Sequence, residues 1–213
     1  LPAALATGSV RRGADMMLST FADLSNMLTG VELNVEGEEH LWSHRPAVFI
    51  FNHQSGLDAL LMARLLRRDI VGVAKEELRN APVVGQLLQL AGTVFVDRGD
   101  RAKALEALRP AVEATTQGLS IVLARGATRS ATRKLGPFKK GAFHMAMAAG
   151  VPIVPVVIRN ALDALPRHAT VIRPATVEIV VHEPIPTKGW THEGLDARIA
   201  EIHRLFEQTL EER

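Results

Sequence analysis

Five short apolar runs recur along the chain, and the stretches between them place apolar residues at helical spacing. The runs are AVFIF (47–51), IVGVA (70–74), TVFV (93–96), SIVLA (120–124) and IVPVVI (153–158). Continuous runs of this length are typical of strands buried on both faces, as in parallel sheets. Strands that alternate with helices place those helices on both faces of the sheet. The sequence therefore predicts a single-domain α/β sandwich with a largely parallel central sheet.

The elements between and around these strands follow from the same patterns. We expect helices over residues 10–27, 58–67, 82–92, 101–117, 138–149 and 193–212. A strand is expected at VELNVEG (31–37), and ATVEIVVHEPI (175–185) is expected to form an edge strand. The first helix is amphipathic and ends before Gly30.

Composition excludes several classes of protein. With 213 residues, 47% of them hydrophobic and 23% charged, the chain is too apolar to be disordered and too charged for a membrane bundle. It has no cysteine, which excludes disulfides, thiolate metal sites and cysteine nucleophiles. The long uncharged stretch at residues 141–158 is divided by Gly150, Pro152 and Pro155, so we expect a helix and a strand there and no membrane span. The chain begins at Leu1 without a signal-peptide pattern, as a processed chain or a piece of a longer one would.

Polar residues follow three of the predicted strands. His53 comes two residues after the first run, Asp97 and Arg98 follow the third, and a basic stretch (125–129) follows the fourth. Ligands of open α/β sheets bind beyond the carboxyl ends of the strands, so these residues are candidates for one site. The excess of Lys and Arg between Arg98 and Lys140 favours an anionic ligand or surface, although a solvated face would give the same pattern. His53 with Asp58 is a candidate catalytic pair, and the alternative is a helix cap beside an unrelated histidine.

Four sequence blocks resemble, in order and spacing, the motifs of the glycerolipid acyltransferases. Asn52, His53 and Asp58 match N-H-x4-D, and GTVFVDR (92–98) matches the second motif. ATRS (127–130) is similar to the end of the third motif, usually F/A-P-E-G-T-R-S, and VPIVPV (151–156) matches the fourth. The resemblance covers about residues 45 to 160 and is closest to the bacterial 1-acylglycerol-3-phosphate acyltransferases.

This resemblance implies an activity and its partners. The chain would transfer a fatty acyl group from acyl-CoA or acyl carrier protein to the free hydroxyl of lysophosphatidic acid, giving phosphatidic acid. It implies no metal, no other cofactor and no nucleic-acid partner. It also implies a peripheral or monotopic protein on the cytoplasmic face of a membrane, with an amphipathic N-terminal helix at residues 1–30 and an acyltransferase domain at 31–213.

The family motif also assigns roles to the candidate pair. His53 would be the general base that takes the proton from the acceptor hydroxyl, since a neutral imidazole suits that task near neutral pH. Asp58 would hold the imidazole tautomer and stabilise the imidazolium. Ser55 lies nearby but needs no covalent role.

The acceptor phosphate requires cations. By similarity Arg129 is the leading candidate, because a guanidinium can grip phosphate through two parallel bonds, and Thr128 stands beside it. Lys75 and Arg98 are second candidates, for which a surface ion pair is the alternative.

The third motif is altered in this chain. Aligned on the Thr-Arg-Ser ending, the usual Pro-Glu-Gly is replaced by Arg125, Gly126 and Ala127, so the motif carboxylate is missing. We therefore expect impaired turnover.

Three alternatives to the main prediction stay open. The acceptor could be glycerol-3-phosphate or a lipid sugar, because the motifs do not encode pocket shape. The chain could be a non-catalytic lipid-binding domain, or a thioesterase in which His53 activates water.

The role of the first helix is a separate question. The helix could lie in a membrane interface or pack its apolar stripe on the domain.

Overall fold

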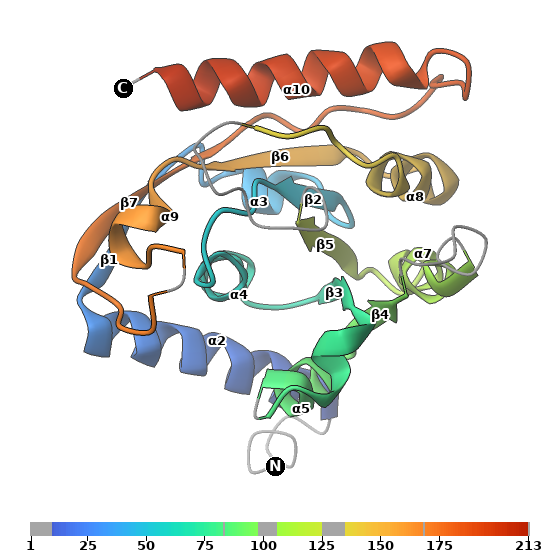
Figure 1. Cartoon of the computed structure of the whole chain (residues 1–213). Coiled ribbons are helices and arrows are strands. Elements are labelled where there is room, and N and C mark those ends of the chain that lie inside the picture. The colour runs from blue at the N-terminus through green and yellow to red at the C-terminus, as the bar shows by residue number, and fades with distance from the viewer. Residues whose placement is uncertain (1–9, 83, 98–105, 125–134, 168, 213) are drawn as a thin grey trace.

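Within the residues that the structure describes, seven strands form one sheet with helices on both faces (Figure 1). The coordinates are a computed structural model and describe residues 10–82, 84–97, 106–124, 135–167 and 169–212. The strands are β1 (Val31–Glu36), β2 (Val48–Phe51), β3 (Ile70–Lys75), β4 (Val94–Val96), β5 (Ser120–Ala124), β6 (Ile153–Ile158) and β7 (Ala175–Val181). The helices are α2 (Val10–Thr29), α3 (His40–Ser43), α4 (Asp58–Leu66), the 3-10 helix η1 (Glu76–Asn80), α5 (Val84–Leu90), α7 (Arg109–Thr115), α8 (Gly141–Ala149), α9 (Ala161–Ala164) and α10 (Leu195–Glu211).

The strand order is β1-β7-β6-β2-β5-β3-β4. The five strands from β6 to β4 are mutually parallel, whereas β7 pairs antiparallel with β6 and parallel with β1. The predicted α/β fold with a largely parallel sheet is confirmed. The prediction of an edge strand at residues 175–185 is wrong, because β7 lies between β1 and β6. Its alternation of buried and exposed residues reflects one solvated face of the strand, not an unpaired edge.

Two hydrophobic clusters cover the two faces of the sheet. On one face Phe49 and Phe51 of β2 pack with α4 and α9. On the other face Val48 and Ile50 pack with α7, α8 and α10. Alternate residues of β2 thus serve opposite clusters, which explains why its sequence is apolar throughout. Because both faces are covered, the carboxyl end of β2 is where polar groups can emerge.

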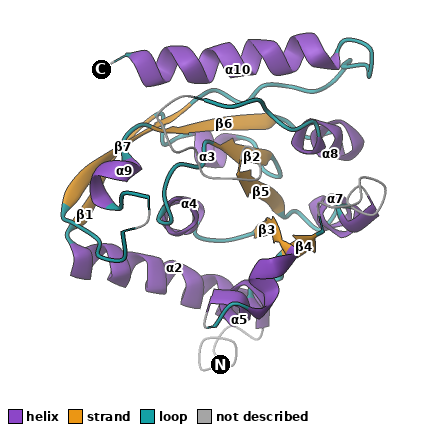
Figure 2. Cartoon of the chain, in the orientation of Figure 1, coloured by secondary structure: helices purple, strands orange, loops and turns teal. Residues whose placement is uncertain are grey.

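Figure 2 shows the helices in purple; most of their limits lie within two residues of the predicted limits, and the starts of two helices differ by more. In the part of the predicted helix 101–117 that is described, Glu106 and Ala107 are helical, Leu108 forms a turn, and α7 begins at Arg109. Pro110 causes this break, because it lacks the N–H that a continuous helix would donate to residue 106. The predicted helix 138–149 begins three residues late, at Gly141. The short elements α3, η1 and α9 were not predicted, because a single turn carries too little periodicity to be recognised.

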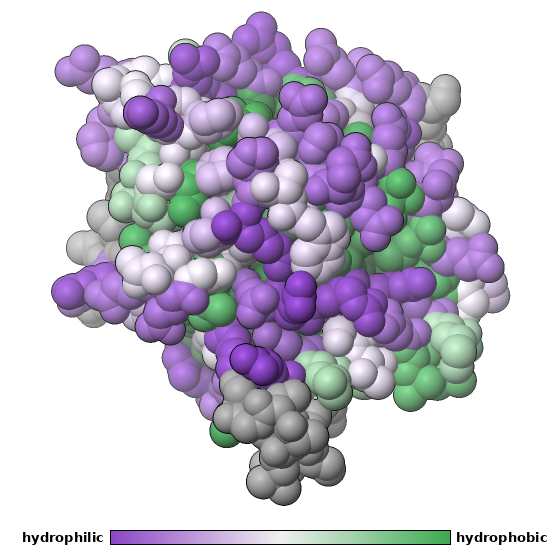
Figure 3. Space-filling view, turned by 180° about the vertical axis from the view of Figure 1, so that it is seen from behind, coloured by the Kyte–Doolittle hydropathy of each residue, from purple (hydrophilic) through white to green (hydrophobic). Residues whose placement is uncertain are grey.

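Helix α2 presents its apolar stripe outward. The residues that it buries are small or polar: Gly13, Ala14, Asp15, Ser19, Ala22 and Asn26. Met16, Phe21 and Leu24 are about half exposed, and Met27 and Leu28 are 71% and 73% exposed. The alternative in which this stripe packs on the domain is therefore wrong. Figure 3, which views the molecule from behind, shows hydrophobic side chains gathered at the lower right, on the side where α2 runs.

Polar contacts attach α2 to the domain. Asp23 forms a bidentate pair with Arg67, with N–O distances of 3.0 and 3.3 Å, and lies 3.6 Å from Arg64 of α4. Asp15 accepts a hydrogen bond from the backbone N–H of Asp69 at 3.1 Å, and burial raises the pKa of the Asp15 carboxyl. The attachment of α2 thus leaves its apolar side chains free to meet another surface.

The last turn of α10 is held by side chains that follow β6 and β7. Arg159 Nε donates to the carbonyl oxygen of Thr209 at 2.9 Å, and His182 Nε2 lies 2.9 Å from the Thr209 hydroxyl. Burial lowers the pKa of His182 from its usual 6.5, although the carboxylates of Glu36 and Glu212 act in the opposite direction. The folded protein therefore favours a neutral imidazole at this position.

Protonation of His182 should make stability depend on pH. Because the pKa of His182 is lower in the folded chain than its unfolded value of 6.5, the unfolded chain binds more protons just below that pH. We expect the free energy of unfolding, measured in urea, to fall as the pH is lowered through about 6.5 and to level off below the folded pKa. His182→Gln should show a smaller fall, whereas the exposed His44→Gln should behave like the parent. Equal falls in all three proteins would contradict this assignment.

Candidate active site

His53 and Asp58 form a pair in the turn between β2 and α4. His53 follows β2 by two residues, and Asp58 is the first residue of α4. His53 Nδ1 lies 2.9 Å from Asp58 Oδ2. The His53 side chain is 25% exposed, whereas the Asp58 side chain is fully buried. The pair thus has one buried member and one that reaches the surface.

Asp58 also binds the turn that carries His53. Its Oδ2 accepts hydrogen bonds from the backbone N–H groups of Gln54 at 2.6 Å and Ser55 at 2.8 Å. The alternative in which Asp58 caps α4 is wrong, because the first residue of the helix directs its carboxylate back to the preceding turn, and α4 has no side-chain cap. One carboxylate oxygen therefore fixes both the turn and the imidazole.

This geometry assigns chemical roles to the two nitrogens of His53. A carboxylate only accepts hydrogen bonds, so the Nδ1 that faces Asp58 carries the proton. Nε2 then keeps its lone pair and can accept a proton from a substrate. The ring also meets Phe51 edge-on, with 6.3 Å between ring centroids. The imidazole is thus oriented on two sides, with a basic nitrogen available for catalysis.

Two further side chains attach this turn to the end of β6 and to the residue after α9. Asn52 is 1% exposed and makes two hydrogen bonds of 2.7 Å with the backbone of Ile158. Ser55 is fully buried, and its hydroxyl donates to the carbonyl oxygen of Leu165 at 2.8 Å. This burial leaves Ser55 no access to a substrate. Neither the Asn52 nor the Ser55 contact was predicted from the sequence. The one feature that could have indicated the first is an amide side chain directly after a continuous apolar strand.

Lys75 lies at the same edge of the sheet as His53. It ends β3, which is separated from β2 only by β5, and in the register Phe51 faces Ala124 while Val73 faces Leu123. The carboxyl ends of β2, β5 and β3 therefore lie side by side, with about 4.8 Å between adjacent strands. Among the residues that the structure describes, no carboxylate pairs with the Lys75 ammonium, so the surface ion pair considered for it is not found there.

The remaining predicted site residues lie outside the described parts of the chain. They are Arg98, Arg125, Gly126, Ala127, Thr128 and Arg129. Within the described parts, no group of three His, Asp or Glu side chains could hold a metal ion, and no helix is apolar over a length that would cross a membrane.

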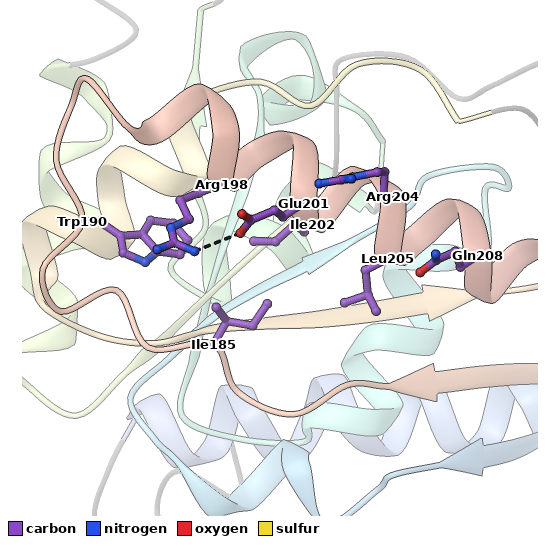
Figure 4. Close-up of a pocket in the computed structure, with 8 residues that line it drawn as sticks. All are labelled: Ile185, Trp190, Arg198, Glu201, Ile202, Arg204, Leu205 and Gln208. Atoms are coloured by element: carbon purple, nitrogen blue, oxygen red, sulfur yellow. Dashed lines mark hydrogen bonds and ion pairs between the residues drawn. The ribbon is translucent and has the colours of Figure 1, made fainter.

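A pocket of about 350 Å³ lies on the opposite face of the sheet from the His53 pair (Figure 4). Apolar side chains of α10 and of the segment before it form its wall, with Arg198 and Glu201 paired at 3.0 Å. Its lining is Ile185, Trp190, Arg198, Glu201, Ile202, Arg204, Leu205 and Gln208. None of the residues that the sequence predicted for the site lines this pocket.

Proteins similar to this chain include acyltransferases from a plant and from human. A 1-acyl-sn-glycerol-3-phosphate acyltransferase from Limnanthes alba is 33% identical over 184 residues, which are 86% of this chain and 65% of that protein. Human 1-acyl-sn-glycerol-3-phosphate acyltransferase alpha is 33% identical over 80% of this chain and 60% of its own length. The chain thus spans less than two thirds of the length of these two curated relatives.

A solved structure and a family model agree with these relatives. The crystal structure of PlsC, the 1-acyl-sn-glycerophosphate acyltransferase from Thermotoga maritima, superposes with a TM-score of 0.77 at 26% identity. The superposition covers 95% of this chain and 82% of that one. Residues 32–159, which contain the His53–Asp58 pair, match the family model described as Acyltransferase. With its fold, its paired residues and this match taken together, the chain belongs to the acyltransferase family.

Proposed function

We propose that this chain transfers a fatty acyl group from a thioester donor to the free hydroxyl of 1-acylglycerol-3-phosphate, giving phosphatidic acid. The observation that carries the proposal is the 2.9 Å pair of His53 and Asp58 at the carboxyl edge of a parallel sheet. The names of the relatives support the acceptor. Acyl-CoA and acyl carrier protein are both candidate donors, because each presents the same thioester.

The proton transfers of the reaction can be assigned to the pair and the two substrates. Nε2 of His53 takes the proton of the acceptor hydroxyl while the hydroxyl oxygen attacks the thioester carbonyl carbon. The tetrahedral intermediate then collapses, the carbon–sulfur bond breaks, and the leaving thiolate takes the proton from the imidazolium. Asp58 stabilises the imidazolium through Nδ1, as the third member of a hydrolytic triad does, and the substrate hydroxyl takes the place of an enzyme serine.

Cations near the strand ends would hold the acceptor phosphate. The proposal for Lys75 is supported by its position at the end of β3, at the same edge of the sheet as His53, and by the absence of a carboxylate partner among the described residues. Arg129, Thr128 and Arg98 are proposed on the motif resemblance, with Arg129 as the bidentate partner. A phosphate held beyond β3 and β5 would bring the acceptor hydroxyl toward His53, because β5 is the neighbour of β2.

Removal of the base should abolish transfer without unfolding the protein. We expect His53→Ala to lower kcat by about a hundredfold to ten-thousandfold, the usual contribution of general base catalysis. Asp58→Asn keeps the shape but loses the charge that supports the imidazolium, so its loss should be smaller. The measurement is the formation of labelled phosphatidic acid from acyl-CoA, and His44→Ala, an exposed histidine away from the pair, is the matched control.

A panel of acceptors separates this proposal from its alternatives. Phosphatidic acid as the main product supports it, and acylated glycerol-3-phosphate or a lipid sugar would replace the proposed acceptor. Free fatty acid alone would indicate a thioesterase. Absence of every product from well-folded protein would favour a non-catalytic lipid-binding domain. Near-parental turnover by His53→Ala would refute the mechanism.

Helix α2 would bring the protein to a lipid surface, which we propose to be the cytoplasmic face of a membrane. Each exposed Met or Leu that enters the interface should contribute about 1 kcal/mol, part of the value for full burial. We expect Met27→Ser with Leu28→Ser to weaken binding to phosphatidylcholine vesicles containing phosphatidic acid by about tenfold or more, measured by sedimentation in high salt. Leu205→Ser, on α10 at the opposite side of the molecule, is the control (Figure 1). Release of the parent by salt alone would rule out apolar insertion.

The altered third motif should limit turnover. We expect the triple change Arg125→Pro, Gly126→Glu and Ala127→Gly to raise phosphatidic acid formation above that of the parent. The double change without the Glu is the matched control, since it restores the turn but not the carboxylate. A parent as active as the triple variant would show that the carboxylate is dispensable in this chain.

A further inference from the structure

The Asn52 side chain forms a complete backbone-like pair with another strand. Its Nδ2 donates to the carbonyl oxygen of Ile158, and its Oδ1 accepts from the N–H of the same residue, both at 2.7 Å. The two residues are 106 positions apart in the chain. A carboxamide carries the same donor and acceptor as a peptide group, so both polar groups of this buried side chain are satisfied.

The hydrogen bonds between Asn52 and Ile158 take the place of backbone pairing between β2 and β6. The main-chain register of β2 with β6 ends where Phe51 faces Val156, and a continued register would bring His53 opposite Ile158. The Asn52 carboxamide binds Ile158 instead, which releases the backbone of His53 from the sheet. The chain can therefore turn at His53 and present the ring to Asp58, while the strand end beneath it stays fixed.

Ile158, the residue that Asn52 binds, is itself held within the sheet. Ile158 is fully buried and faces Ile179 of β7 on its other side. Beyond the histidine, Ser55 binds the carbonyl oxygen of Leu165, which follows α9. The turn is thus attached to the β6–α9 segment on both sides of His53.

We propose that Asn52 is a positioning residue for the His53–Asp58 pair. It acts through the histidine and does not touch a substrate. Its effect on turnover rests on the proposed function, whereas its effect on the His53 ring does not. Without the carboxamide, the backbone at residues 52 and 53 loses its link to β6, and the distance between Nδ1 and the carboxylate is no longer fixed.

The chain offers a matched control in Asn160. This asparagine is more exposed than Asn52 and also makes two hydrogen bonds to a strand, on the other side of β6, donating to the carbonyl oxygen of Thr176 at 3.0 Å and accepting from the N–H of Glu178 at 2.8 Å. It links β6 to β7 and does not adjoin the histidine in sequence. Loss of either carboxamide removes two hydrogen bonds to a neighbouring strand, but only Asn52 precedes the proposed base.

The kinetic test compares Asn52→Ala with Asn160→Ala per mole of folded protein. We expect Asn52→Ala to lower kcat by about tenfold to a hundredfold with little change in KM, the size of effect that follows a small misplacement of a catalytic group. Asn160→Ala should stay within about threefold of the parent. In an Asp58→Asn background, the added loss from Asn52→Ala should be much smaller, because the pair through which it acts is already impaired.

The second measurement does not depend on activity. The ¹⁵N chemical shifts of the His53 ring distinguish its two neutral tautomers, and we expect the Nδ1–H form to dominate in the parent and in Asn160→Ala. Asn52→Ala should show a mixture. If Asn52→Ala fails to fold, Asn52→Asp, which keeps the volume but loses the donor to Ile158, takes its place.

Three results would overturn the proposal. The first is an Asn52→Ala variant whose His53 tautomer and kcat are unchanged from the parent. The second is an equal loss of kcat in Asn52→Ala and Asn160→Ala. The third is failure of both Asn52 variants to fold, which would show that Asn52 serves only the fold. A parent without activity toward any acceptor would remove the proposed function, and the ring nitrogens would still decide the role of Asn52.

Discussion

The proposed site depends on one buried carboxylate oxygen. Asp58 Oδ2 receives an N–H from the His53 ring and two more from the backbone of Gln54 and Ser55. A buried carboxylate without such donors would be costly, so the turn must close around it. Closure in turn sets which nitrogen of His53 is protonated. The contacts that satisfy Oδ2 of the buried Asp58 thus include the one that leaves Nε2 of the partly exposed His53 with its lone pair.

The parallel sheet gives this turn its place. β2 is central and covered on both faces, so its chain can only leave the core at the strand end. Lys75 leaves the sheet at the same edge, two strands away. The polar contacts of Asp23 and Asp15 hold α2 while its apolar residues face outward. A lipid acceptor has an apolar part and a charged part, and the described surface offers a candidate partner for each.

The sequence was informative where a pattern repeats and uninformative where a contact joins distant residues. Continuous apolar runs identified the strands from β2 to β6, because a strand that is buried on both faces needs apolar residues at every position. The position of β7 was misjudged, since an exposed face and an exposed edge both produce alternation. Pro110 was present in the sequence, but the interruption that it causes just before α7 was not predicted. The His53–Asp58 pair was predicted from motif spacing, whereas the bonds of Asn52 to Ile158 span 106 positions and have no local signature.

The geometry of the pair supports the removal of a proton from a hydroxyl more fully than it supports the choice of acceptor. Nε2 of His53 can take a proton from any hydroxyl that reaches it, including that of water, so the base alone does not separate a transferase from a thioesterase. The separation must come from groups that hold the acceptor in place long enough to exclude water. We propose that those groups lie at the ends of β5, β3 and β4, which follow β2 in the strand order. We therefore expect the change in the third motif, where Gly126 stands in place of the carboxylate usual in the family, to affect acceptor binding and turnover before it affects the base.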